Sequence, residues 1–285
     1  MRTFKKIAEV ESHPVNACKN SISLLISFIP RSAYLTKNLV QEHLRRNYVP
    51  MGTYVDIRED SRCVFNQDRY FSLTENKSTF IKFLSFNLKS EDIAVINCYG
   101  EADTNVVSSA IAFAKLKAGS YAVIADDTDI AVMLLHHWTE EMDDVYFVKQ
   151  RTLSAWSIRY AERGMKDIKS DILFLHAFTG CDSTSAIFFK GKVAVVKLFR
   201  KCKVLQGVSK VFMNDKSTPE EIGKAAALGI KAVYNCAADK SLGKIRYQKY
   251  IDMSCRGNIL PEKLPPTERA SCFHGLRVFY QIMQW

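Results

Sequence analysis

The sequence predicts an α/β protein built on a parallel sheet, and three observations carry this prediction. Short apolar segments typical of buried strands occur at Ile93–Tyr99, Tyr121–Ala125 and Val145–Lys149. Segments of helical period alternate with them, and this order is typical of a parallel sheet with helices on both faces. After residue 150 the helical pattern dominates, which indicates a helical C-terminal region.

Each predicted helix has its own signal. Lys77–Leu88 and Asp129–Trp138 carry apolar residues at helical spacing, and Asp103–Ala118 has an acid in its first turn and Gly119 just past its end. Asp171–Phe178 leads into the polar loop Thr179–Ser185, and a basic helix is expected at Val193–Lys203. Further on, a capping box with Pro in the first turn opens a helix at Thr218 that runs to about Cys236, and Leu264-Pro-Pro-Thr267 is a break before the last helix.

Composition excludes several classes of protein. Of 285 residues, 47% are hydrophobic and 11% aromatic, which is a globular composition rather than a disordered or low-complexity one. The longest apolar candidate, Ser21–Pro30, is too short for a membrane span, so no membrane partner is expected. The N-terminus lacks a secretory pattern and the eight cysteines are spread along the chain, which favours reduced thiols in an intracellular protein. The nucleus is the expected location.

Charge is distributed unevenly along the chain. The formal net charge is +10, but residues 91–144 hold eleven carboxylates against two lysines, while the remainder holds 38 bases against 19 acids. Basic surface attracts polyanions, and a focused acidic cluster attracts a metal cation. The alternative interpretation is a basic globular protein with a solvated acidic face.

Three acidic clusters follow apolar segments: Glu101 with Asp103, Asp127 with Asp129, and Asp182 in the polar loop. Because the carboxyl ends of parallel strands meet at one edge of a sheet, we expect these five carboxylates to converge. Oxygen ligands suit Mg²⁺ or Mn²⁺ rather than zinc. The alternative for each pair is that an acid at a helix N-terminus only caps the helix.

A basic, acid-free segment follows the polar loop. Gly191 would allow close approach of a phosphate to the backbone at the start of a helix. Neighbouring bases would neutralise further phosphates, so the predicted contacts are Lys190, Gly191, Lys192, Lys197 and Arg200. The alternative is an amphipathic helix with a solvated basic face.

Four motifs in order carry a resemblance to a known superfamily. They are Gly100-Glu-Ala-Asp-Thr104, Ala125-Asp-Asp-Thr-Asp-Ile-Ala-Val132, Leu175-His-Ala-Phe-Thr-Gly-Cys-Asp-Ser-Thr-Ser185 and Phe189-Lys-Gly-Lys-Val193. Together they resemble the PIN-like nucleases on their flap-endonuclease side and, more closely, a group of transposon-associated animal proteins that also carry a C-terminal LPPT. The resemblance covers residues 76–285.

The resemblance implies a parallel sheet flanked by helices and an acidic pocket that binds two divalent ions and cuts phosphodiester bonds. Carried over by motif, the catalytic metal ligands are Glu101, Asp103, Asp127, Asp129 and Asp182. It also implies a nucleic-acid partner, DNA rather than RNA, and three regions: a truncated N-terminal part (1–75), a nuclease core (76–210) and a helical extension (211–285).

The sequence departs from the family in one respect that bears on activity. The family's first strand and a later strand each carry an Asp, and neither can be placed among the acids of the first 75 residues. Two functions therefore stay open: a metal-dependent, structure-specific nuclease, or a catalytically inactive nucleic-acid-binding protein derived from a transposon. A Toprim-like domain is disfavoured by the short interval from Glu101 to Asp127.

Overall fold

The computed structural model describes residues 53–58, 60–62, 66–98, 102–117, 119–150, 152, 154–188, 190–255, 257 and 261–285, and the backbone of 26–28. The described residues fall into two units, one up to Phe113 and the other from Ala114 to Trp285, and each is described by itself. The predicted region boundaries at 75/76 and 210/211 both fall inside helices, α5 (Thr74–Ser90) and α11 (Lys203–Phe212).

The described residues of the first unit include a short parallel pair of strands and several helices. Strand β1 (Ile26–Phe28) pairs with β2 (Val95–Asn97), and α4 (Gln67–Phe71) precedes α5. The buried side chains of this unit come mainly from α4 and α5 and include Ile57, Tyr70, Phe80, Leu84 and Leu88. Helix α6 (Ala102–Lys115) begins in this unit. The helix predicted at Lys77–Leu88 lies within α5. In the described residues, the strand predicted at Ile93–Tyr99 is present only as the three residues of β2, which are half-buried or exposed and pair with β1 rather than with β3 (Tyr121–Ile124).

The second unit has a mixed three-stranded sheet. Strand β3 (Tyr121–Ile124) pairs in parallel with β4 (Val145–Lys149), as the sequence predicts, but β4 also pairs in antiparallel with β5 (Ser154–Ser157). The fold is therefore α/β with a mixed sheet rather than an all-parallel one. The side chains of β5 are exposed or half-buried, so no apolar run marks this strand in the sequence.

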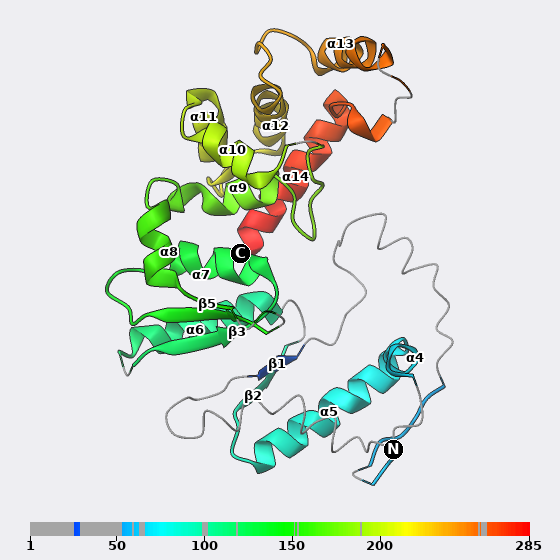
Figure 1. Ribbon diagram of the computed structural model, residues 1–285, viewed down its shortest axis with the longest axis vertical. Helices are drawn as coiled ribbons and strands as arrows, with labels where there is room; N and C mark the ends of the chain where they lie inside the picture. The colour runs from blue at the N-terminus through cyan, green and yellow to red at the C-terminus, as the bar shows by residue number, and fades with distance from the viewer. Residues whose placement is uncertain are drawn as a thin grey trace. The chain divides into compact units, whose positions relative to one another are not determined.

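Helices α7 (Thr128–His137) and α8 (Ile158–Met165) pack beside this sheet (Figure 1). Met133 and Leu134 of α7 are fully buried, as are Val145 and Phe147 of β4. Ser157 caps α8 by accepting a hydrogen bond from the backbone N–H of Tyr160.

A helical layer follows the sheet and contains α9 (Ile172–Phe178), α10 (Lys192–Phe199), α11, α12 (Pro219–Val233), α13 (Leu242–Ser254) and α14 (Glu268–Gln284), with single 3₁₀ turns at Lys169–Asp171 and Pro261–Lys263 (Figure 1). The helix predicted at Val193–Lys203 is in fact two helices. The chain turns at Arg200–Cys202, where Cys202 is extended, and the Gln206 side chain donates to the carbonyl oxygen of Phe199 at 2.9 Å. The predicted capping box of Thr218 and Glu221 is confirmed at the start of α12.

Close packing of α9, α11, α12 and α14 forms the core of this layer. The rings of Phe174 and Phe178 lie 5.0 Å apart, and Phe212 packs 5.2 Å from Phe174. A Cβ at Gly229 would lie 2.8 Å from the Phe178 ring, and one at Gly275 would lie 2.6 Å from the Ala226 methyl group. Glycine therefore allows α12 to approach α9 and α14 this closely.

Candidate functional site

Asp127 caps helix α7. Its backbone is extended, and its carboxylate Oδ1 accepts a hydrogen bond from the backbone N–H of Asp129 at 2.9 Å. A carboxylate here satisfies one of the free N–H groups of the first turn and interacts favourably with the helix dipole. The capping role that the sequence left open as an alternative is therefore present at Asp127.

Asp129 is buried and is paired with a histidine. Its Oδ1 lies 2.7 Å from Nε2 of His176, a residue of α9 that is only 6% exposed. The His176 ring in turn lies 5.6 Å from the ring of Trp285, centroid to centroid. This pair joins the N-terminal end of α7 to α9, and the histidine supplies the hydrogen-bond partner that a buried carboxylate needs.

The contacts of Lys192 differ from those expected of a phosphate-binding residue. Although the residue as a whole is exposed, its Nζ donates to the carbonyl oxygens of His176 (3.0 Å) and Gly180 and to Oγ1 of Thr179 (3.4 Å). These are acceptors at the C-terminal end of α9, where a cation is favourable. The Lys192 ammonium thus has three hydrogen-bond acceptors within the protein. These contacts indicate a structural role for Lys192 instead of the predicted contact with phosphate.

Burial lowers the pKa of the Lys192 ammonium, and the nearby charges of Cys181 and Asp129 act in the opposite direction. Lys192 is thus linked to Asp129 through His176, whose carbonyl oxygen accepts from the lysine and whose ring bonds the carboxylate.

The loop after α9 has a fixed conformation. Gly180 has a φ of +108°. The buried Thr184 accepts from the backbone N–H of Cys181 at 2.9 Å and donates to the carbonyl oxygen of Ala177 at 2.6 Å. These bonds hold the exposed Asp182 in the turn between them.

Three of the five predicted carboxylates come from neighbouring segments of the second unit. Asp127 and Asp129 flank the start of α7, Asp182 follows α9, and the Asp129–His176 bond and the Lys192 ammonium link these segments. Asp103 lies in the first turn of α6, in the first unit, and Glu101 lies outside the described residues. Within the described ranges, no three His, Cys, Asp or Glu side chains are grouped so that they could hold a metal ion.

The other four residues predicted to contact phosphate, Lys190, Gly191, Lys197 and Arg200, differ from one another in what lies around them. Arg200 forms two hydrogen bonds with Asp167, of 2.7 Å and 3.2 Å, which lower the pKa of that carboxyl group. The Lys190 ammonium lies 5.5 Å from the ring centroid of Tyr234. Gly191 is the N-cap of α10 with φ −65°, and a Cβ there would meet nothing within 4 Å, so its backbone faces open space. Lys197 is exposed.

Sequence reasoning did not include Lys210 in this basic surface and did not find the pairing of His176. Residues 183–214 contain seven lysines and arginines and no acid, and Lys201, Lys203 and Lys210 are exposed along with Lys197. In the described part of the chain, none of these four ammonium groups has a carboxylate within ion-pair distance. For Lys210 the available signal was that the acid-free segment continues as far as Asn214. No local pattern links His176 to Asp129, which is 47 residues away.

Comparison with protein-family models, curated proteins and solved structures found no match for this chain. Among the helices that the structure describes, none is both long and apolar enough to cross a membrane. In the second unit, Asp127, Asp129 and Asp182 form an acidic end at α7 and α9, and two consecutive basic helices, α10 and α11, follow it in the chain.

Proposed function

We propose that this chain binds the sugar–phosphate backbone of nucleic acid along α10 and α11. The observation that carries the proposal is a set of exposed lysines that have no carboxylate partner among the described residues, Lys197, Lys201, Lys203 and Lys210. Lys197 lies on α10 and Lys201 in the turn after it, while Lys203 and Lys210 are seven residues apart on α11, a spacing that places both on one side of that helix. Exposed cations without carboxylate partners can neutralise the phosphates of a duplex.

The open backbone at Gly191 supports the same proposal. The N-terminal end of α10 carries free N–H groups and a partial positive charge, and no side chain of Gly191 covers it. Contacts of this kind position a nucleic acid and do not read its bases. We therefore propose a binder with little sequence preference, of PIN-like, flap-endonuclease-like descent, with DNA as the favoured partner.

A paired charge substitution tests the binding surface. Lys197→Gln together with Lys203→Gln should weaken binding to duplexes of unrelated sequence alike, and the slope of log K against log salt should become shallower by about 0.9 for each phosphate that the variant no longer neutralises. The control is Lys166→Gln with Lys224→Gln, which removes the same charge from lysines paired with Glu140 and Glu220. Fluorescence anisotropy over a salt series measures both quantities. Equal slopes for the two double variants would contradict the proposal.

Phosphodiester hydrolysis with Mg²⁺ or Mn²⁺ is the second candidate function. It is favoured by the acidic end, where Asp127, Asp129 and Asp182 offer hard oxygen donors on segments that lead into the basic helices. Within the described ranges these three residues do not form a three-ligand group, and Asp129 already has His176 bonded to it. The described part of the second unit therefore does not by itself fit a two-ion site, which is why binding without hydrolysis is the leading proposal.

A further inference from the structure

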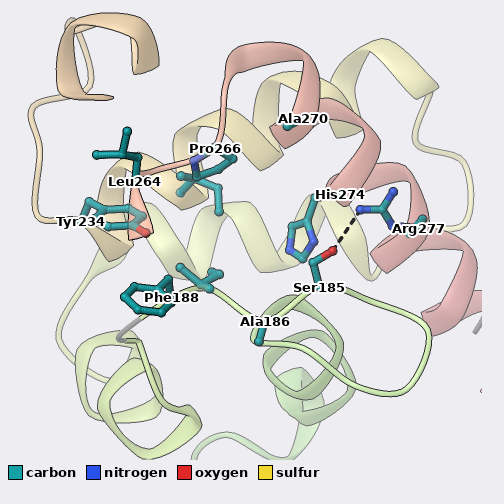
Figure 2. A pocket seen from close by; sticks show the side chains of 11 residues that line it. Ser185, Ala186, Phe188, Tyr234, Leu264, Pro266, Ala270, His274 and Arg277 are labelled. Carbon is teal, nitrogen blue, oxygen red and sulfur yellow. Dashed lines mark hydrogen bonds between the residues drawn. The ribbon is translucent and has the colours of Figure 1, made fainter. Parts of the chain in front are cut away.

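A pocket of about 190 Å³ opens between the loop after α9 and helices α12 and α14 (Figure 2). Most of its wall is apolar, from Ile187, Phe188, Ile230, Leu264 and Pro266. Figure 2 shows the rings of Phe188 and Tyr234 at one end, and Arg277 with Ser185 and His274 at the other. An apolar cavity of about 150 Å³ is large enough for benzene, so this pocket has room for one aromatic ring with a substituent.

Arg277 gives the pocket a cationic end. Its Nη2 donates to Oγ of Ser185 at 3.3 Å, and in the described ranges no carboxylate lies within ion-pair distance of its guanidinium. Partial burial lowers the pKa of Arg277, although a guanidinium stays charged at neutral pH. A partly desolvated cation without a counter-ion is unfavourable, and a bound anion would offset that cost.

The other polar groups of the pocket do not neutralise the Arg277 guanidinium. Among the described residues, no acidic side chain lines it. Nε2 of His274 lies 3.0 Å from the carbonyl oxygen of Phe178, and burial lowers the pKa of His274 to about 4, so the ring is neutral at pH 7 and donates to that oxygen. Lys190, above the Tyr234 ring, adds a second cation near the aromatic end.

We propose that this pocket binds a small aromatic acid, with its ring against the apolar wall and its anionic group on the guanidinium of Arg277. The planar fork of an arginine matches the two oxygens of a carboxylate or a phosphate. The shared chemistry is one aromatic ring carrying one oxyanion. This ligand site is separate from the proposed nucleic-acid surface of α10 and α11.

Three probes of similar shape test the site: phenylacetate, the uncharged phenylacetamide, and phenyl phosphate. Ligand-observed NMR titration of the full chain should give phenylacetate at least about tenfold tighter binding than phenylacetamide. Tighter binding of phenyl phosphate than of phenylacetate would assign the site to phosphate esters, and the reverse order to carboxylates. Equal binding of acid and amide, or no binding of any probe up to about 10 mM, would overturn the proposal.

Single substitutions test separately how the charge of Arg277 and the shape of the pocket contribute to binding. Arg277→Gln should remove the preference for acid over amide, whereas Arg269→Gln, on the same helix but outside the pocket wall, should retain it. Ala270→Leu, which adds side-chain volume to the pocket wall, should weaken binding of acid and amide together. Circular dichroism checks that each variant is folded. An acid preference that survives Arg277→Gln in a folded protein would contradict the assignment.

Discussion

Gly180 occupies a position in the loop after α9 that only glycine fits. Its φ is +108°, and a Cβ there would lie 2.6 Å from the Cα of Ala186. Gly180→Ala should therefore reduce the free energy of unfolding by about 1–3 kcal/mol, measured by urea denaturation. Gly207 within α11 is the matched control, because a Cβ there meets nothing within 4 Å. Gly207→Ala should stabilise the protein by about 0.4–1 kcal/mol, and a stable Gly180→Ala variant would show that the loop can rearrange.

Because the pKa of His274 is lowered in the folded state, we expect the protein to lose stability in mild acid. Burial lowers this pKa to about 4, against about 6.5 for an unperturbed histidine. Between these values the unfolded chain binds a proton that the folded chain does not, so the contribution of His274 is unchanged above pH 6.5 and is lost as the pH falls towards 4. The size of this loss is about 3 kcal/mol, since each pKa unit corresponds to about 1.4 kcal/mol.

A substitution isolates this residue from the other titrating groups. His274→Gln keeps an N–H donor for the carbonyl oxygen of Phe178 but does not titrate. The variant should show a smaller fall in unfolding free energy between pH 7 and pH 4.5 than the wild type, measured by urea denaturation at each pH. Parallel stability curves for the two proteins would refute the assignment.

At the scale of elements, the C-terminal end of α9 depends on a lysine from the next helix. The Lys192 ammonium binds three oxygen atoms there, and its removal would leave partly buried acceptors without this donor. Lys192→Met should lower the free energy of unfolding by about 1–3 kcal/mol. Lys197→Gln, one turn or more along the same helix and exposed, should change it by less than about 0.5 kcal/mol. Chemical denaturation that shows equal stability for both variants would return Lys192 to the phosphate-binding set.

The basic segment shows which features of a helix sequence patterns predict and which they do not. Composition alone predicted a basic helix after the polar loop, and the structure has basic helices there. The spacing of charges did not show that the segment breaks at Cys202 or that Lys192 and Arg200 have partners inside the protein. Those partners, Asp167 and the end of α9, precede the helix and are brought to it only by the packing of the chain.

At the scale of the whole molecule, a cleavage assay decides between hydrolysis and binding alone. If the acidic end is active, flap, hairpin and single-stranded substrates should be cut with Mg²⁺ or Mn²⁺, and Asp127→Asn with Asp129→Asn should abolish cleavage while DNA affinity stays equal or rises. Asparagine retains a hydrogen-bond acceptor for His176 and for the cap of α7, so the variant should stay folded. Wild-type activity no higher than that of the double variant would leave binding without hydrolysis.

The sequence by itself determined the local elements, because periodicity, caps and breakers act over a few residues. Helices α5, α7 and α12 and strands β3 and β4 lie where their patterns predict. Tertiary structure alone decided that β5 joins the sheet in antiparallel, that Asp129 pairs with His176, and that Arg277 faces an apolar pocket. These features join residues that local patterns do not connect, and their energies come from burial and from hydrogen bonds between separate segments of the chain.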